Sequence, residues 1–258
     1  MRDIASEGDE RGIQIDRVGI RELHLPVMIR EKGGRLAHML GDFDASVQLP
    51  HTERGTHMSR FVQILSQWSK KAVSSVEMEQ MVREIVSGFE ADSAQVSLSF
   101  SYFLDKCAPA SGEPCQLDYP CTFEGRFDDG EYAFTMAVTV PIITVCPCSL
   151  EISDQGAHSQ RANLTVRLQA RPGRLIWLED LIPLLEHQGS CDIFPLLKRS
   201  DEKFVTEAAF DNPKFVEDVV RDTVLALRGL EGITWYSVEC VSQESIHNHV
   251  AYAYAESH

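Results

Sequence analysis

Alternation of apolar and polar residues marks several stretches of the chain as β-strands. Residues 96–104 place apolar side chains at every second position, with serines at most of the positions between them, which is the pattern of a strand that buries one face. The same period recurs at residues 132–140 and 164–168. Weaker strand patterns cover residues 117–127, 233–241 and 250–255. The chain is therefore expected to be rich in half-buried strands.

A hairpin is the simplest interpretation of the first part of the chain. Residues 15–30 and 36–49 both have the composition of extended segments, and Gly33 and Gly34 lie between them. Paired glycines between two extended segments predict a turn.

Apolar residues at helical spacing predict two amphipathic helices after this hairpin. One apolar stripe runs from Met58 to Trp68, and a second runs from Met78 to Phe89 with Ser75 as its expected N-cap.

The second half of the chain also contains two predicted helices. Residues 178–186 form one, in which Pro183 either dents the helix or marks its first turn. For the other, Asp211 or Asn212 is the expected cap, with Pro213 at the first helical position and an apolar stripe up to Gly229.

The order of these elements is ββααββ, repeated twice, with the turn at residues 128–130 as the joint. We therefore predict an α+β fold with antiparallel sheets. Its expected parts are a flexible N-terminus (residues 1–13), a first ββααββ unit (14–128) and a second ββααββ unit (129–258).

Composition and charge narrow the classes of function. The 258 residues include 24 Lys and Arg against 39 Asp and Glu, a net charge of -15 that repels nucleic acids and anionic membranes at long range. We expect neither as a partner, although a local basic cluster can still bind a nucleotide. Seven irregularly spaced cysteines favour reduced thiols. With no apolar run of about 18 residues and no signal-like start, a cytoplasmic protein is expected.

The stretch VCPCSLEISDQGAHSQR, residues 145–161, interrupts two regular strand patterns with a polar loop. Long polar loops of this kind often have a function. Cys146 and Cys148 flank Pro147, and His158 follows within the same loop. A thiolate and an imidazole suit a metal ion, but this is not the CxxC spacing of common zinc sites. Judged by spacing alone, a CPC sequence followed by one histidine is more often a coincidence of structure than a metal site.

A second cluster, ESIHNH, lies near the C-terminus. His247 and His249 would point to one face of an extended chain, where they could supply a ligand and a proton carrier or remain solvated surface groups. An HNH nuclease conflicts with the acidic charge and the missing basic patch.

Two charged features complete the candidates. Residues 196–207 contain Lys198, Arg199 and Lys203, which form either a solvated loop or a triphosphate contact beside a carboxylate ligand. Glu217 borders the apolar stripe of its helix, where Arg221 at i+4 could pair with it as a simple rim charge.

Five segments together resemble the type IB GTP cyclohydrolases, in matching order over nearly the whole chain. They are GTHMSRF (55–61), CPCSLEIS with GAHSQR (146–161), LLKRSDEKFVTE (196–207), NPKFVEDVVRD (212–222) and ESIHNHVAYA (244–253). Leu150 departs from the lysine that the resemblance leads us to expect. The resemblance implies the tunnelling fold, in which helices cover one face of antiparallel sheets and subunits join their sheets into barrels with active sites at the interfaces. A homotetramer is the expected assembly.

The resemblance also implies the reaction of GTP and water to formate and 7,8-dihydroneopterin triphosphate, the first step of folate or related pterin synthesis. By matching positions it implies these roles: metal ligands Cys146, His158, Glu202 and His247; purine anchor Glu217; catalytic residues Cys146, His158 and His249; phosphate contacts Lys198, Arg199 and Lys203.

The implied chemistry explains these residue types. Carbon 8 of guanine reacts poorly with water at neutral pH, and a divalent ion lowers the pKa of a neighbouring water molecule. A histidine can protonate N7, and a carboxylate facing N1–H and the 2-amino group selects guanine over adenine. The mixed ligands suit zinc or manganese, and the carboxylate also admits iron.

Two alternatives stay open. A nitrile reductase of the same fold would use Cys146 or Cys148 as a covalent nucleophile with a nicotinamide cofactor. A non-catalytic, zinc-stabilised assembly protein would close a tetrahedral site with the same ligands and leave no open position.

Overall fold

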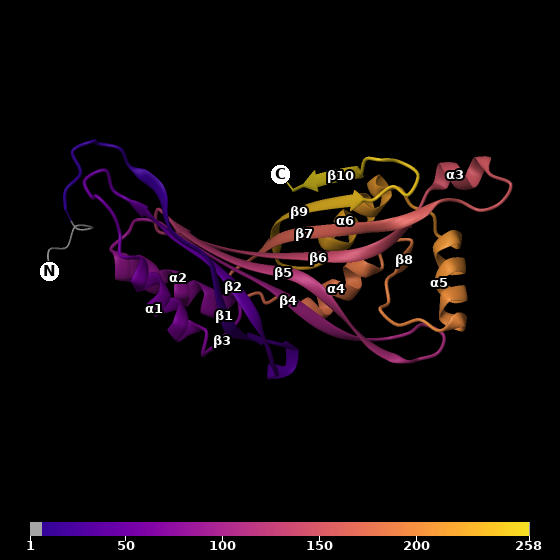
Figure 1. Cartoon of the computed structure of the whole chain (residues 1–258), viewed down its shortest axis with the longest axis horizontal. Coiled ribbons are helices and arrows are strands. Elements are labelled where there is room, and N and C mark those ends of the chain that lie inside the picture. Colours follow the sequence, from indigo (N-terminus) through magenta and orange to yellow (C-terminus); the bar gives the residue numbers. More distant parts are fainter. Residues whose placement is uncertain (1–6, 258) are drawn as a thin grey trace. The chain divides into compact units, whose positions relative to one another are not determined.

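Long antiparallel strands form the main sheet in the computed structural model, which describes residues 7–257 (Figure 1). The strand order through hydrogen-bonded neighbours is β10-β9-β7-β6-β5-β4-β2-β1-β3, with β8 paired to β6. The α+β prediction is confirmed. The described residues form two compact units: unit 1 holds those up to Phe100 together with Thr122–Met136, and unit 2 holds Ser101–Cys121 and the chain from Ala137 on.

The first half of the chain follows the predicted ββααββ order, with one short added strand. Its elements are β1 (Ile15–Arg30), β2 (Leu36–Leu49), α1 (Met58–Trp68), β3 (Ala72–Val73), α2 (Ser75–Phe89), β4 (Ala94–Cys107) and β5 (Pro114–Asp128). The β1–β2 hairpin has the predicted bounds. Gly33 and Gly34 in its turn have φ values of 82° and 86°, which glycine adopts without steric strain.

Helices α1 and α2 bury the apolar side of unit 1. Phe61 of α1 stacks on Phe89 of α2 with ring centroids 4.2 Å apart. Met81 and Ile85 of α2 are fully buried. Alternate residues of β2 and β4, such as Phe43 and Leu98, are also fully buried. The predicted half-buried strands are thus covered by the predicted amphipathic helices.

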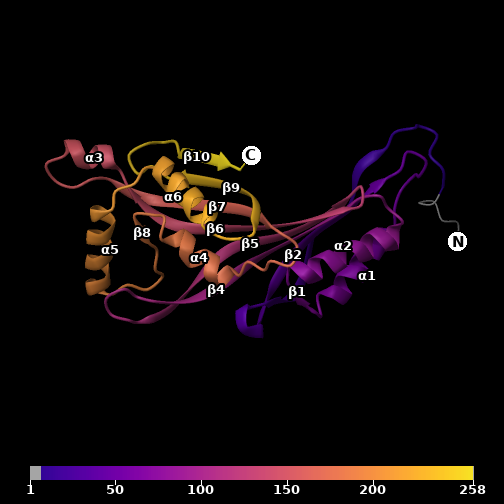
Figure 2. The ribbon, with the colours of Figure 1, turned by 180° about the vertical axis from the view of Figure 1, so that it is seen from behind.

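The second half of the chain contains more elements than the ββααββ order. They are β6 (Glu131–Val145), α3 (Pro147–Ile152), β7 (Ser159–Ala170), α4 (Leu178–Glu186), β8 (Cys191–Asp192), α5 (Arg199–Asp211), α6 (Val216–Arg228), β9 (Ile233–Ser242) and β10 (Ala251–Glu256). The strands β7, β9 and β10 pair antiparallel in that order, and α6 packs against β9 and β10. Figure 2 shows this arrangement from behind.

Helix α4 continues through Pro183. A proline inside a helix removes one backbone hydrogen bond. The buried stripe of Leu181, Ile182 and Leu185 compensates by packing into the core of unit 2.

Residues 196–207 were open to interpretation as a solvated loop, and that interpretation is wrong from Arg199 on, because α5 begins there. The helix is hard to find by periodicity since only Asp201 and Ala209 on it are buried. Phe204 and Phe210 remain exposed.

The predicted start of α6 at Pro213 is also wrong. Asn212 is instead the C-cap of α5, and its Nδ2 donates to Gly189 O at 3.1 Å. Lys214 N donates to Val145 O at 3.0 Å. These long-range hydrogen bonds keep the chain non-helical before Val216, and Phe215 is the N-cap of α6. The predicted end of the helix at Gly229 is confirmed.

The N-terminal part of the chain was expected to be flexible over residues 1–13. Residues 1–6 lie outside the described residues, and Gly8 forms an isolated antiparallel bridge with Glu53. The division into units at residues 128 and 129 stays a prediction about repeated topology. Among the described residues, no helix is long and apolar enough to cross a membrane.

The N-cap of α2 is Ser74 rather than the predicted Ser75. The Ser74 hydroxyl accepts from Val76 N at 3.3 Å and donates to the Glu77 carboxylate. Glu77 in turn binds Arg30 of β1 at 2.9 Å. A capping hydroxyl is therefore tied both to the helix start and to the sheet of unit 1.

Ser74→Ala is expected to lower the free energy of unfolding by about 1 kcal/mol, because the first turn of α2 loses its cap. Ser75→Ala serves as the control and should leave stability nearly unchanged. Urea denaturation followed by circular dichroism measures both. Equal losses in the two variants would contradict the assignment of Ser74 as the cap.

Candidate active site

Cys146 and His158 lie side by side where β6 ends and β7 begins, around the short helix α3 (Figure 1). Cys146 N donates to His158 O at 3.1 Å. Ser149 links the two residues further: its N–H donates to Cys146 Sγ at 3.4 Å, and its hydroxyl accepts from His158 N at 3.3 Å. Hydrogen bonds within the CPC loop thus hold Cys146 and His158 next to each other.

Gln160 orients the imidazole of His158. Its Oε1 lies 2.9 Å from His158 Nδ1, and an amide oxygen can only accept, so Nδ1 carries the proton. The Gln160 amide nitrogen donates to Thr144 Oγ1 at 3.2 Å and to Glu244 Oε1 at 3.3 Å. This tautomer leaves the His158 Nε2 lone pair available to a ligand.

His247 and His249 lie in the loop between β9 and β10 rather than in the final strand. Their rings stack with centroids 4.9 Å apart and planes inclined by 10°. Both side chains are exposed. Glu244 lies near the start of this loop, and its carboxylate Oε2 is 3.8 Å from His158 Nδ1. The predicted pairing of the two imidazoles on one side of the chain is therefore present, although in a turn.

The remaining predicted ligand, Glu202, lies exposed in the first turn of α5. Within residues 7–257, no three His, Cys, Asp or Glu side chains are grouped as a metal site requires. Cys146 and His158 fit a divalent ion by donor chemistry and proximity. Glu202 has a suitable oxygen donor, but it is not joined to that pair, so the fit of the four predicted ligands is partial.

The basic residues of α5 are largely paired with carboxylates. Lys198 Nζ forms an ion pair with Glu113, which directly precedes β5, and Lys203 Nζ lies 3.7 Å from Glu207. Arg199 is exposed. A phosphate group that bound here would have to compete with these carboxylates.

Asp201, the neighbour of Glu202, is completely buried. Burial by itself would raise the pKa of its carboxyl, but hydrogen bonds from Lys198 N, from Ser111 and from Ala110 N outweigh burial and hold the pKa below its usual value. Asp201 is therefore an ionised, fully hydrogen-bonded group inside unit 2.

Glu217 lies exposed near the start of α6, close to the thiol of Cys240 on β9. Burial raises the pKa of Cys240 to about 12, and the negative charges of Glu217 and Glu239 add to the shift. Arg221, the expected partner of Glu217, instead binds Asp218 Oδ1 at 3.3 Å. In the described part of the chain, the Glu217 carboxylate has no ion-pair or hydrogen-bond partner. The alternative role of Glu217, a surface ion pair with Arg221, is therefore not supported.

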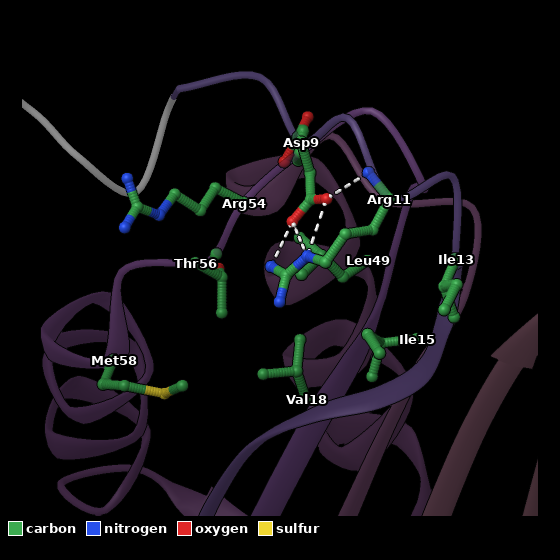
Figure 3. A pocket seen from close by; sticks show the side chains of 11 residues that line it. Asp9, Arg11, Ile13, Ile15, Val18, Leu49, Arg54, Thr56 and Met58 are labelled. Carbon is green, nitrogen blue, oxygen red and sulfur yellow. Dashed lines mark hydrogen bonds and ion pairs between the residues drawn. The ribbon is translucent and has the colours of Figure 1, made fainter.

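Unit 1 contains a separate cavity of about 420 Å³, shown in Figure 3, that none of the predicted site residues line. Thr56 and Met58 of the GTHMSRF segment line it together with apolar side chains such as Leu49. Asp9 Oδ1 accepts from Arg11 Nε at 2.9 Å, and Arg54 binds Glu7 at 3.1 Å. Both guanidinium charges at the cavity are thus already compensated.

Sequence reasoning did not assign roles to Gln160 and Glu244 or to the buried side of Asp201. Each lies inside a segment that the resemblance singled out, GAHSQR, ESIHNH and LLKRSDEK. The signal that could have identified them is that each lies within three residues of a candidate ligand in the sequence. Their partners Thr144, Ser111 and Ala110 are far away in sequence, so spacing alone could not identify the contacts.

The fold is similar to that of solved uricases. The uricase from Arthrobacter globiformis superposes with a TM-score of 0.54 at 8% identity, covering 93% of this chain and 92% of the uricase. The uricase from Bacillus fastidious gives a TM-score of 0.56 at 7% identity, covering 96% and 94%. At such low identity the similarity concerns the fold alone, and it defines this chain as a tunnelling-fold protein.

Sequence comparison then gives the family. Residues 1–253 match the family model described as type I GTP cyclohydrolase folE2. A GTP cyclohydrolase FolE2 from Thiobacillus denitrificans is 46% identical over 256 residues, covering 99% of this chain and 94% of the relative. One from Kosmotoga olearia is 46% identical, covering 99% and 98%. The chain belongs to the type I GTP cyclohydrolase folE2 family and is an enzyme of that class.

Proposed function

We propose that the protein is a metal-dependent GTP cyclohydrolase that converts GTP and water to formate and 7,8-dihydroneopterin triphosphate, the first step of folate or related pterin synthesis. The observation that most supports this proposal is the pairing of Cys146 with a His158 whose Nε2 is left free. The names of the relatives support the choice of GTP as substrate.

In this proposal Cys146, His158, Glu202 and His247 hold zinc, manganese or iron. When bound, the ion supplies Lewis-acid chemistry, which lowers the pKa of water enough for attack on carbon 8 at neutral pH. Gln160 keeps His158 in the tautomer that can bind a metal through Nε2. The Ser149 N–H, which donates to Cys146 Sγ, helps to hold the sulfur in place.

His249 is the proposed proton carrier. It would protonate N7 of the purine as the bond from water to carbon 8 forms. Breaking the bond from carbon 8 to one ring nitrogen then opens the ring and leaves carbon 8 as a formamide on the other nitrogen. A second water hydrolyses this formamide and releases formate, and rearrangement of the ribose closes the pterin ring with loss of one water, so that one water is consumed overall. The exposed stack of His247 and His249 would place a proton carrier beside a ligand.

Glu217 is the proposed guanine anchor. Its carboxylate would accept from N1–H and from the 2-amino group, a pair of donors that adenine lacks. The pairing of Arg221 with Asp218 favours this role, since it leaves the Glu217 carboxylate free to accept from a base. Lys198, Arg199 and Lys203 are proposed to contact the triphosphate.

A homotetramer with active sites shared between subunits is the proposed assembly. The described residues of one chain do not group the four ligands, and β10 and β3 end the strand order with unpaired edges. Exposed sheet edges favour pairing with another copy. The nitrile reductase and the non-catalytic assembly protein are disfavoured by the family match.

The proposed function is tested by incubating the purified protein with GTP and each divalent metal, followed by oxidation and measurement of neopterin fluorescence and formate. Both products are expected in equal amounts with at least one of zinc, manganese and iron. Cys146→Ala should lose metal and turnover together, because the thiolate ligand is gone.

Cys148→Ala is the matched control in the same loop, since the Cys148 side chain is exposed. It should retain bound metal and turnover. Equal metal content in the wild type and Cys146→Ala, measured by elemental analysis, would reject the ligand assignment.

Mixed subunits test whether the site is shared. Cys146→Ala and Glu217→Ala are each expected to be inactive, and subunit exchange between them should restore part of the activity if the metal and the purine anchor come from different chains. Exchange is verified by mass spectrometry of tagged subunits. Verified mixed oligomers without activity would place both groups in one chain.

Glu217→Gln is expected to reduce kcat/KM for GTP by about ten- to a few hundredfold, because charge-assisted hydrogen bonds are worth roughly 1.5–3 kcal/mol. Bound metal should stay unchanged. Glu239→Gln is the matched control, since Glu239 is an exposed carboxylate that also lies near Cys240. Wild-type kcat/KM in Glu217→Gln rejects the anchor role, and loss of metal would show that Glu217 lies elsewhere in the site.

A further inference from the structure

A buried carboxylate joins the start of α5 to the tip of the β4–β5 hairpin in unit 2. Asp201 Oδ1 accepts from Ala110 N at 2.8 Å and from Ser111 N at 2.7 Å. Its Oδ2 accepts from Ser111 Oγ at 2.7 Å and from Lys198 N at 2.9 Å. Both oxygens therefore have two donors each, and the side chain is completely buried.

The same hairpin also holds the chain segment that precedes α5. Lys106 of β4 is nearly buried and donates from Nζ to Glu186 Oε1 at 2.5 Å and to Ile193 O at 3.2 Å. The segment between α4 and α5 is thus fixed to β4 near its beginning and to the hairpin tip at its end.

These contacts determine where Glu202 lies. In a helix, consecutive residues are rotated by about 100°, so Asp201 can point into the protein while Glu202 points outward. The burial of the one and the exposure of the other agree with this geometry. Asp201 lies 90 residues along the chain from Ser111, so the position of Glu202 depends on a distant hairpin.

We infer that Asp201 is a positioning residue for the metal ligand Glu202, and that the tip of the β4–β5 hairpin thereby controls metal affinity. The inference rests on the proposed function, because it takes Glu202 as a ligand. Asp201 itself does not touch the metal or the substrate. It fixes the first turn of α5, so loosening it lets the Glu202 carboxylate occupy many positions, of which few are productive.

We call the hydrogen bonds that Asp201 accepts from Ala110, Ser111 and Lys198 the Asp201 clamp, and three variants test it. Asp201→Asn keeps the size of the side chain but directs an amide NH₂ at a backbone N–H donor. Ser111→Ala removes the hydroxyl that donates to Asp201 Oδ2, and Ser111 is itself not a proposed ligand. Ser111→Thr retains the hydroxyl. Gln116→Ala is the control, since Gln116 Nε2 donates to Asp105 Oδ1 at 2.8 Å on the same hairpin and is not among the donors to Asp201.

Hydrogen exchange of the Ala110 and Ser111 amides reports on the clamp, and competition between the folded protein and a chromophoric chelator for Mn²⁺ reports on the metal. Asp201→Asn should weaken Mn²⁺ binding by about 10- to 100-fold, the range found for groups that orient metal ligands. Ser111→Ala should weaken it less, with faster exchange in both variants. Ser111→Thr and Gln116→Ala should bind Mn²⁺ like the wild type.

Faster exchange in Asp201→Asn and Ser111→Ala with wild-type Mn²⁺ affinity would overturn the inference, because the clamp would then have no influence on the metal. Unchanged exchange in Ser111→Ala would reject the clamp itself, even if Asp201→Asn fails to fold. A wild type that consumes no GTP and binds no Mn²⁺ would overturn the proposed function, and the exchange rates would still measure the clamp separately.

Discussion

Covering one face of long antiparallel strands with helices is the constraint on which both units of this protein depend. Every second residue is buried from Gly41 to Leu49 of β2 and from Ala94 to Phe100 of β4, and the helices α1 and α2 supply the apolar surface that covers such positions in unit 1. In unit 2, α6 has the same relation to β9 and β10. Because the strands and covering helices are occupied by packing, chemistry is left to the strand ends and loops. Three of the four candidate ligands follow this rule, since Cys146 and His158 flank α3 and His247 lies between β9 and β10, whereas Glu202 lies in the first turn of α5.

Charge is the second constraint in a chain with a net charge of -15. Buried charges need partners, and here they have them: Lys106 binds Glu186, and Asp201 accepts four hydrogen bonds. The pairing of Lys198 with Glu113 and of Lys203 with Glu207 also lowers the local positive potential of α5. A triphosphate would gain affinity there only by displacing exposed carboxylates, which costs little because exposed ion pairs are weak.

Periodicity was enough to predict the strands and most helices, since burial of one face imposes the period directly. The stripe of α2 follows from it, whereas the bounds of β1 and β2 follow from two extended segments divided by Gly33 and Gly34. Periodicity failed where distant contacts decide local structure. Helix α5 has almost no apolar stripe and depends on Asp201 bound to a hairpin far away in sequence. Pro213 would be a good first residue of a helix, yet Asn212 and Lys214 are held by Gly189, Gln188 and Val145.

The candidate site shows the same division between local and distant information. Cys146 and His158 belong to one loop, and local hydrogen bonds through Ser149 bring them together, so their shared segment was a usable signal. Gln160 connects His158 to Thr144 and Glu244 by side-chain hydrogen bonds, which the spacing of residues along the chain does not predict. A thiol and an imidazole that are ordered in advance lose little conformational entropy when a metal binds. In the proposed function, the exposed residues Glu202 and His247 are contributed by other segments and would have to meet at Cys146 and His158.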